Sequence, residues 1–600
     1  MIESSSPHSF HIPVMGTGYT IDTPIRVAQY GISSVISIID HKLTEKMREY
    51  YSRIYNFEFE LIKESESDCR AKRITAYLNL VQRIVSLNFN KLKTSAFDDG
   101  SEITKYFEML SDTSPLKRKY LEMLLLKKEE RVLAEEELRN LISPGSIDVN
   151  IMTKIDGPSQ KREEAELVEF NDAHAALRGF AKSNLSSSVV FSAGLNPRLY
   201  SYISNFEDFF PNADGKLKKK VVLKVSDYRS ALIQGKFLAK KGIWVSEFRI
   251  ESGLNCGGHA FATDGFLLGP ILKEFNENRT QLKEILFELY SAALIPLDKP
   301  VVASIPKIAV TVQGGVGTSD EHSYLLEHEQ ANSIGWGSPF LLVPEAVSID
   351  AESLNLLAKT GEKDYYLSNA SPLGVRFNTV LGNSADIEKS RRIAEGKPGA
   401  PCIKKHLAFN TEFTEEPICT ASSKFQKKKI DELFAKNLSE IDFKKSFSKI
   451  IEKTCLCVGL GNGSLIEKGE SLAKGTQGVA ICPGPNTAYF SQIVSLKDMV
   501  DHIYGRQNII SFKERPNMFV KELQLYMSYV KEKIEENYIE QSEKQKKYID
   551  RFLTNLSDGI SYYEQVFEEF KNQIGEVSTQ ALQDFSGIKA ELNALGSLKV

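Results

Sequence analysis

A histidine directly after two glycines, Gly257-Gly258-His259, is the stretch of this 600-residue sequence whose residue types could do chemistry. Adjacent glycines let main-chain N–H groups approach a ligand closely, and an imidazole changes its charge near neutral pH. Two further glycine-bearing stretches follow downstream, and they contain Gly314, Gly315, Gly337 and Ser338. Together these turns predict a cradle for an anionic group such as a phosphate, with an acid or base beside it. A plain turn that ends in a structural histidine is the alternative interpretation.

Eight short apolar runs must position these turns, and each contains or ends in Gly, Ser, Asn or Asp. They read HIPVMGTGY, ISSVISIID, VNIMTKID, SSVVFSAGLN, KKVVLKVSD, IWVSEFRIESG, KIAVTVQGGVG and SIGWGSPFLLV. Most are separated by stretches with helical spacing, such as DYRSALIQGKFLAKKG. This alternation predicts an α/β protein with a TIM (β/α)8 barrel, and an open doubly wound sheet is the alternative. In a barrel the glycine turns would lie at the carboxyl ends of the strands, where binding sites gather.

The rest of the chain predicts three additions to a barrel formed by residues 1–42 and 143–362. Residues 43–142 are rich in Leu, Glu and Lys at helical spacing, which predicts a helical insertion after the second strand. Residues 363–510 have shorter elements with many Gly, Pro and Cys, which predicts a small Cys-containing α+β module. Residues 511–600 predict one or two long helices that pack on the body or on a second subunit. The apolar face of that region carries Leu523, Met527, Val530 and Ile534.

The order of these turns resembles the FMN-dependent barrel family of nitronate monooxygenases (2-nitropropane dioxygenases) and FMN-containing enoyl-acyl-carrier-protein reductases. The opening strand of that family is matched by Pro13-Val14-Met15-Gly16-Thr17. The resemblance implies that the FMN phosphate lies on the two downstream glycine turns. It also implies that the ring lies near Met15 and Gly16, with His259 facing its reactive edge. Asn255 and Cys256 stand where family members usually carry an acidic residue and Ala, and this departure bears on the substrate.

Two further roles follow from the resemblance and from positions at strand ends. Lys224 would neutralise the anionic reduced flavin, and Asn196 would hydrogen-bond the ring or the substrate. A solvated lysine and a helix-start turn at Asn196-Pro197 are the alternatives. The full set of expected cofactor-binding residues is Met15, Gly16, Thr17, Asn196, Lys224, Asn255, Gly257, Gly258, Gly314, Gly315, Gly337 and Ser338.

Five of the seven cysteines lie near short Gly/Pro turns in one part of the chain. They are Cys402, Cys419, Cys455, Cys457 and Cys482. Thiolates in such positions are candidate ligands for zinc or for an iron–sulfur cluster that relays electrons to the flavin. No C-x-x-C pair occurs, and buried free thiols are the alternative. A second candidate metal group, His322 and His328 with Glu321 and Glu329, is expected to be a solvated helical face.

Charge and hydropathy exclude some classes of function. The net charge of -4 gives no field that would attract nucleic acid. No apolar stretch is long enough to span a bilayer and no signal peptide is recognisable, so a cytoplasmic location is expected. The leading hypothesis is an FMN-dependent oxidoreductase acting on a small organic substrate, with NAD(P)H or dioxygen as candidate co-substrates. The alternatives are a flavin-free phosphate-binding barrel enzyme, such as an isomerase or synthase, and a non-catalytic assembly protein. A homodimer through the C-terminal helices is a further expectation.

Overall fold

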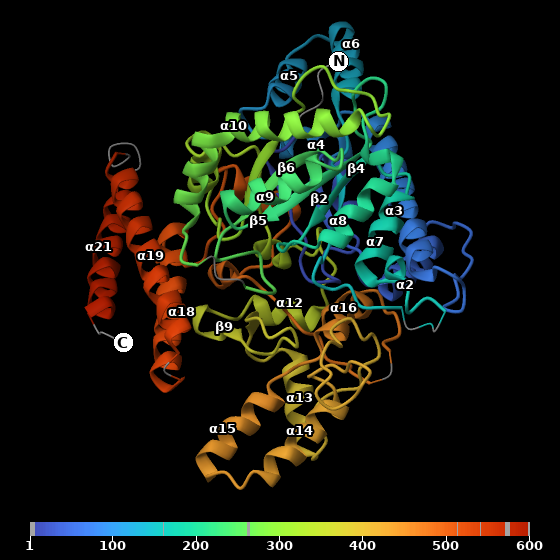
Figure 1. Ribbon diagram of the computed structural model, residues 1–600. Coiled ribbons are helices and arrows are strands. Elements are labelled where there is room, and N and C mark those ends of the chain that lie inside the picture. The colour runs from blue at the N-terminus through green and yellow to red at the C-terminus, as the bar shows by residue number, and fades with distance from the viewer. Residues whose placement is uncertain are drawn as a thin grey trace.

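The computed structural model describes residues 6–159, 161, 163–260, 264–473, 475–512, 514–540, 542–569 and 576–597. A closed barrel of eight parallel strands in sequential order lies at its centre (Figure 1). β1 pairs with both β2 and β8, and this pairing closes the barrel. The strands are β1 (Phe10–Ile12), β2 (Ser33–Ser37), β3 (Ile147–Ile151), β4 (Ser187–Phe191), β5 (Lys219–Val225), β6 (Val245–Glu251), β7 (Ala309–Gln313) and β8 (Ile334–Gly335). The predicted TIM barrel is confirmed, and each strand overlaps one of the eight apolar runs, although β1 begins one residue and β3 two residues before its run.

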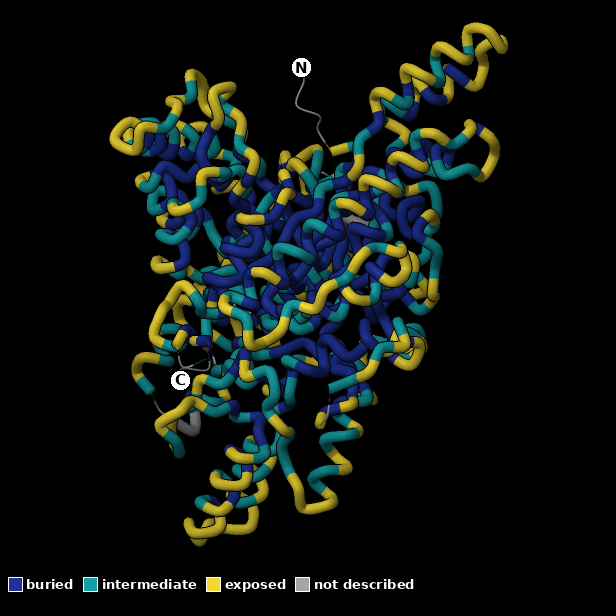
Figure 2. Tube along the Cα trace, turned by 90° about the vertical axis from the view of Figure 1, so that its right-hand side faces the viewer, coloured by how far each residue is buried: buried dark blue, intermediate teal, exposed yellow. Residues whose placement is uncertain are grey.

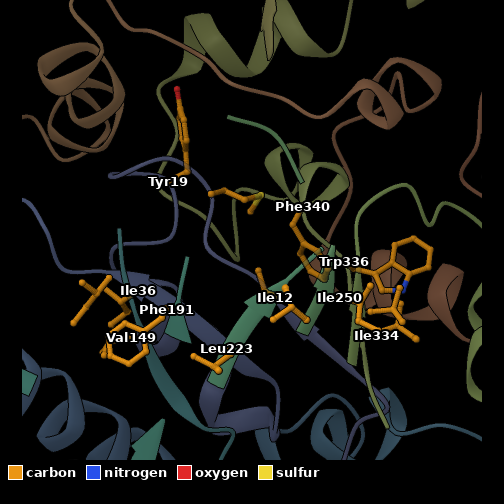
Figure 3. Close-up of a cluster of buried hydrophobic side chains, with 14 of the residues drawn as sticks. Ile12, Tyr19, Ile36, Val149, Phe191, Leu223, Ile250, Ile334, Trp336 and Phe340 are labelled. Atoms are coloured by element: carbon orange, nitrogen blue, oxygen red, sulfur yellow. The ribbon is translucent and has the colours of Figure 1, made fainter. Parts of the chain in front are cut away.

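Side-chain alternation along the strands builds the two sides of the barrel wall. Ile36, Val149, Phe191 and Leu223 face outward and lie close together in the core between strands and helices (Figure 3). The residues between them face inward and are more mixed in polarity. A separate apolar layer inside the barrel consists of Val35, Val190 and Val222, with Val14 packed against it. The polar inward positions above this layer belong to the barrel mouth, which here means the rim at the carboxyl ends of the strands.

Most strands are followed by a helix that covers the outer wall. These elements are α1 (Thr23–Val27) with a 3-10 turn (Ala28–Tyr30), α7 (Asp172–Ala181), α8 (Pro197–Tyr202), α9 (Tyr228–Ala239), α10 (Leu268–Leu294), α11 (Ser319–Glu327) and α12 (Ala351–Leu357). A 3-10 turn (Ser338–Leu342) follows β8 directly. Further 3-10 turns are Val168–Phe170, Ile203–Asn205, Glu207–Phe209 and Glu362–Asp364.

The chain between β2 and β3 is helical, as predicted. It forms α2 (His41–Ile54), α3 (Cys69–Thr94), α4 (Glu102–Met109), α5 (Pro115–Leu124) and α6 (Lys128–Leu141). α3 packs along both α2 and α7, so it takes the place of an ordinary outer helix of the barrel. The shorter helices that follow build a small core of their own, which includes Phe97, Phe107 and Tyr120. The insertion is therefore partly barrel wall and partly an added helical cluster.

The chain after the barrel returns to cover the mouth, and its last described part is helical. Its first part contains the antiparallel pair β9 (Tyr365–Ser368) and β10 (Phe377–Val380), then α13 (Ser384–Ala394), α14 (Ser423–Ala435), α15 (Glu440–Ile451), α16 (Leu456–Glu467), a 3-10 turn (Pro485–Tyr489) and α17 (Leu496–Ile503). The last part forms α18 (Met518–Glu540), α19 (Glu543–Glu569) and α21 (Glu576–Ser597). α14 and α15 project away from the barrel (Figure 1).

The C-terminal region differs from the prediction of one or two long helices. Its described residues form three, and α18 packs along α19, which packs along α21. Leu523, Met527 and Val530 are buried, as their helical spacing predicts, and Ile534 is partly buried. Buried residues concentrate around the barrel and exposed ones on the projecting helices (Figure 2). No helix in the described part of the chain is long and apolar enough to cross a membrane. The domain boundaries and the homodimer stay predictions.

Candidate functional site at the barrel mouth

The three glycine turns pack against one another at the ends of β6, β7 and β8, which are neighbours in the barrel. A Cβ at Gly314 would lie 2.7 Å from the Asn255 backbone, and a Cβ at Gly337 would lie 2.6 Å from the Cβ of Cys256. The turn after β6 therefore fits between the turns after β7 and β8. This close approach is why these positions require glycine.

Four main-chain N–H groups in the turns after β7 and β8 are buried and unpartnered. They belong to Gly315, Val316, Gly337 and Ser338, and none donates a hydrogen bond to any residue that the structure describes. Buried N–H groups without an acceptor are rare in folded proteins, because each costs about 1–3 kcal/mol. Donors gathered in two adjacent turns fit the oxygen atoms of a phosphate. The residues present thus fit the phosphate group of FMN at the predicted place.

A buried ion pair holds the turn after β7 in position. The Arg515 guanidinium lies 2.7 Å from a carboxylate oxygen of Glu321, and both side chains are almost fully buried. The same carboxylate accepts from the N–H of Gly317 at 2.8 Å, and Arg515 donates to the Gly315 carbonyl at 2.9 Å. The expectation that Glu321 lies on a solvated helical face is wrong, because α11 turns this residue toward the glycine turn. Sequence reasoning missed this ion pair.

A buried histidine supports the turn after β8. The indole N–H of Trp336 donates to Nδ1 of His322 at 3.1 Å, and Nε2 of His322 lies 3.0 Å from the Ser9 hydroxyl. Burial lowers the pKa of His322 to about 4, so the ring is neutral at neutral pH. His322 is thus a structural group, whereas His328, directly after the helix, is exposed.

A segment from the module after the barrel lies across these turns. The N–H of Gly484 donates to the Ser338 hydroxyl at 2.7 Å, and this hydroxyl donates to the Cys256 carbonyl at 2.8 Å. Asn486 donates to the Val316 carbonyl at 2.7 Å. The Ser338 hydroxyl is therefore used by the protein, and its N–H remains for a ligand.

A hydrogen-bonded trio of inward-facing side chains crosses the other half of the mouth. Nζ of Lys224 lies 2.8 Å from the Glu251 carboxylate, which also accepts from Gln313 at 2.9 Å. The charge of Lys224 is thus compensated by a neighbour that sequence reasoning missed. The signal was available, because Glu247, Arg249 and Glu251 place polar groups at every second position of β6.

Two further buried polar atoms of the barrel lack partners. They are Oδ1 of Asn150, which faces inward on β3, and Oγ1 of Thr17, in the loop after β1. Met15, which precedes Thr17 in that loop, is 3% exposed, and Gly16 has a φ of 55° that favours glycine. Unpaired buried polar atoms at the mouth fit a ligand with a polar edge, such as a flavin ring.

His259 lies at the edge of the mouth under the module. Its Nε2 is 2.6 Å from the Ser371 hydroxyl, and its ring packs edge-on against Phe377. Burial and the nearby charge of Lys154 lower its pKa to about 4. The imidazole is therefore neutral at neutral pH, so it could act as a hydrogen-bonding group or a base. Its predicted catalytic role stays a prediction.

The two predicted asparagines are engaged by the chain itself. Asn196 caps α8, since Oδ1 accepts from Leu199 N–H at 3.1 Å and Nδ2 donates to the Thr153 carbonyl at 3.1 Å. Asn255 closes the turn after β6, since Oδ1 accepts from Gly257 N–H at 2.9 Å and Nδ2 donates to the His259 carbonyl at 3.1 Å. For Asn196 the structure shows the alternative interpretation, a turn that starts a helix.

The five clustered cysteines do not converge on one point. Cys482 lies at the mouth, where Gly258 donates to its carbonyl at 3.2 Å and its thiol meets the N–H of Gly16. The other four, Cys402, Cys419, Cys455 and Cys457, stay within the module and are free thiols. Within the described residues, no group of three or more His, Cys, Asp or Glu side chains is arranged to hold a metal ion. The zinc or iron–sulfur interpretation stays a prediction.

Neither a protein-family model nor a curated protein matches the sequence. Solved structures that are similar to this chain include FabK from Thermotoga maritima, at 13% identity and a TM-score of 0.30, which covers 68% of this chain and 85% of that one. The enoyl reductase domain of MlnA, from the macrolactin biosynthesis cluster of Bacillus amyloliquefaciens, is similar at 14% identity and a TM-score of 0.33. That match covers 64% of this chain and 86% of that domain. Scores this low carry no argument about function, which depends on the site.

Proposed function

We propose that the protein is an FMN-dependent oxidoreductase that acts on a small organic substrate at the barrel mouth. The observation that carries this proposal is the set of four buried, unpartnered N–H groups in adjacent turns after β7 and β8. A phosphate satisfies such donors without a positively charged side chain, because main-chain dipoles supply the partial positive charge. FMN brings a phosphate and a polar ring edge, which match the two kinds of unpaired groups at the mouth.

Each half of the mouth has its own task in this proposal. The N–H groups of Gly315, Val316, Gly337 and Ser338 would hold the phosphate. Asn150, Thr17 and Gln313 would hydrogen-bond the polar edge of the ring, and the ion pair of Lys224 with Glu251 would keep the local charge near zero. When bound, FMN supplies hydride or electron transfer to or from the substrate.

The substrate would enter beside the turn after β6. A Cβ at Gly258 would meet no atom within 4 Å, so this turn borders open space. His259 would present a neutral imidazole there, held by Ser371, which can accept or pass on a proton. Oxidation of a nitronate by dioxygen and reduction of an activated double bond by NAD(P)H are both compatible with this arrangement. Anaerobic mixing with NADH or NADPH distinguishes them, because only the second reaction requires bleaching of the flavin by a nicotinamide.

A visible spectrum of the purified protein tests the proposal. We expect flavin absorption, release of FMN on denaturation, and rebinding of one FMN per chain. Riboflavin is the matched control, because it lacks only the phosphate, and we expect it to bind at least 100-fold more weakly, about 2.7 kcal/mol. A colourless protein that ignores added FMN would refute the proposal. If inorganic phosphate or a sugar phosphate raised its melting temperature instead, the flavin-free phosphate-binding barrel would be favoured.

A further inference from the structure

The hairpin of α14 and α15 stands out from the body of the protein (Figure 1). It leaves the module at Ser422, whose hydroxyl accepts from Phe425 N–H at 3.2 Å and caps α14. It returns beside Lys453, whose carbonyl accepts from the Gln426 side chain at 3.1 Å. α15 packs on α14, and none of its 12 residues is buried. The end of the hairpin away from these anchors is residues 434–441, which we call the hairpin tip.

The hairpin tip exposes three large apolar side chains. Phe434 is 65% exposed, Leu438 is 41% exposed and Ile441 is 79% exposed. The ring of Phe434 lies 5.0 Å from that of Phe443, which lies 5.9 Å from that of Phe447, so an aromatic row continues from the tip along the hairpin. Single apolar residues on a surface are ordinary, whereas a group of them at the end of a projecting element indicates a contact site.

The hairpin behind this tip is basic in a chain that is acidic overall. Residues 423–451 contain eight lysines and four acidic residues, whereas the whole chain has a net charge of -4. One of the acidic residues, Glu432, is paired with Lys429 at 2.9 Å and with Lys436 at 2.6 Å. Such an excess of positive charge attracts an anionic partner. Five of the lysines form no ion pair with any residue that the structure describes: Lys424, Lys427, Lys428, Lys445 and Lys449.

We propose that the hairpin tip docks on the surface of an anionic lipid bilayer. Helices that lie at such a surface bury apolar side chains about 5–10 Å deep and place lysines among the headgroups. The three apolar residues lie within about one helical turn of the end of the hairpin, about 5 Å, which suits this depth. The lysines behind them have long stems that reach the lipid phosphates while the helices stay in water.

The place of the apolar residues favours a lipid surface over a protein partner. Phe434 is in the last turn of α14, Leu438 is in the connection and Ile441 is in the first turn of α15. They therefore surround an end and do not line one helix face. A fluid interface receives an end whose side chains differ in direction, whereas a helix-binding partner requires a continuous apolar stripe.

The connection between α5 and α6 is a second apolar end, and it supplies the matched control. Leu125 there is 88% exposed and Leu133 is 76% exposed. α6 carries five glutamates and only three basic residues, so an anionic surface would repel it. The two ends therefore separate the effect of apolar exposure from that of charge.

The test is co-sedimentation of the full-length protein with phosphatidylcholine vesicles that contain about 30 mol% phosphatidylserine, at about 0.05 M salt. We expect binding to these vesicles to be at least about tenfold tighter than to pure phosphatidylcholine, and to weaken as the salt concentration rises. Phe434→Ser/Ile441→Ser should weaken binding to the anionic vesicles by about tenfold or more. Leu125→Ser/Leu133→Ser removes as many exposed apolar side chains and should bind as the wild type does.

Charge reversal tests the lysines separately. Lys445→Glu/Lys449→Glu should weaken binding to the anionic vesicles by at least about tenfold, and the loss should shrink in high salt. Lys544→Glu/Lys547→Glu makes the same change in net charge at two exposed lysines of α19, and it should leave binding within about twofold of the wild type. Thermal melts report whether each variant folds.

Four results would overturn the proposal. The first is no binding to the anionic vesicles at low salt, and the second is equal binding to both kinds of vesicle. The third is unchanged binding in the two hairpin variants. The fourth is a wild-type dimer that Phe434→Ser/Ile441→Ser converts to a monomer, or tighter binding to heparin than to vesicles, because the occupant would then be a second copy or a soluble polyanion. None of these readouts depends on flavin, so this proposal and the proposed function can fail separately.

Discussion

The two halves of the barrel mouth present opposite kinds of polarity. In the half formed by β7 and β8, the available groups are main-chain N–H donors with no acceptor in the described structure. In the half formed by β5 and β6, the charged side chains of Lys224 and Glu251 satisfy each other. In the half formed by β7 and β8, which we call the phosphate half, an anion would therefore be held by main-chain N–H groups. In the half formed by β5 and β6, which we call the ring half, the paired side chains would leave the local charge close to zero. A phosphate attached to a neutral heteroaromatic ring has this division of charge.

Both halves are completed by chain from beyond the barrel. The turn after β7 is held by Arg515 and by His502, whose Nε2 lies 2.8 Å from the Gly317 carbonyl. The loop after β6 is held by Glu522 of α18, which accepts from Gly253 N–H at 2.8 Å and from Leu268 N–H at 3.0 Å. Removing the C-terminal helices would therefore damage the site itself, and a loss of activity on truncation would not indicate a separate assembly function.

The largest expected effect is on the phosphate half, through Arg515→Ala. This change leaves the buried Glu321 carboxylate with two main-chain N–H donors and no counter-charge. Breaking a buried ion pair on one side costs about 3–5 kcal/mol. We expect a loss of that size in the free energy of unfolding, measured by denaturant titration, together with loss of FMN binding in the protein that remains folded.

Arg551→Ala is the matched control, because Arg551 forms an exposed ion pair with Asp264 at 2.9 Å. Exposed pairs contribute less than about 1 kcal/mol. If Arg515→Ala and Arg551→Ala lost the same free energy of unfolding, the ion pair of Arg515 with Glu321 would not stabilise the turn after β7 as a buried pair. The difference between the two halves of the mouth would then be smaller than proposed.

The next effect, on cofactor affinity, comes from Gly337→Ala. The added Cβ would lie 2.6 Å from the Cβ of Cys256, so the turn must move and displace the N–H groups of Gly337 and Ser338. We expect FMN to bind about 100-fold more weakly, about 2.7 kcal/mol, by fluorescence titration. Gly361→Ala is the control, because no atom lies within 4 Å of its new Cβ and its φ is -116°. Equal affinity in Gly337→Ala and the wild type would show that these amides do not hold the phosphate.

The barrel could be predicted from the sequence because the patterns that mark its strands and turns are local. Each strand overlaps one apolar run that contains or ends in turn residues, and the glycine pairs mark turns whose backbone lies close to other segments of the chain. The partners of those turns could not be predicted, because they depend on contacts between distant positions. Arg515 meets Glu321 across 194 residues, and a lone arginine before a helix has no local signal for that role.

The same limit explains the cysteines and the charged pair on β5 and β6. Closeness in sequence made the five thiols candidate ligands for one metal or cluster, yet Cys482 lies at the barrel mouth. Lys224 was recognised from its place at a strand end, but its partner Glu251 was not, since the pairing depends on the register between β5 and β6. Which polar side chains pair with each other depends on the folded barrel, whereas glycine turns can be recognised in the local sequence.

A smaller effect is expected in the ring half from Lys224→Met. The change leaves Glu251 with Gln313 but without its counter-charge, so the mouth gains a net negative charge. We expect FMN to bind about tenfold more weakly, about 1.4 kcal/mol. The double variant Lys224→Met/Glu251→Gln restores neutrality and should bind within about twofold of the wild type. Lys220→Met, on the exposed end of the same strand, is the control. A double variant as weak as the single one would mean that Lys224 attracts the cofactor directly and that its charge is not cancelled.

The smallest effect is the pH dependence of stability contributed by His259. Burial and Lys154 lower its pKa to about 4 in the folded protein, below the ordinary value of 6.5, so the unfolded chain binds a proton more readily. The stability that this group contributes is therefore complete above about pH 6.5 and is lost as the pH falls toward 4. Because the side chain is partly exposed, we expect a loss on the order of 1 kcal/mol at pH 5. Thermal melts at pH 7.5 and pH 5 measure it, with His259→Gln showing a shallower acid slope. If His259→Gln kept the wild-type slope, the pKa of His259 would be the same in the folded and unfolded protein. The site would then not contain the neutral imidazole that we propose.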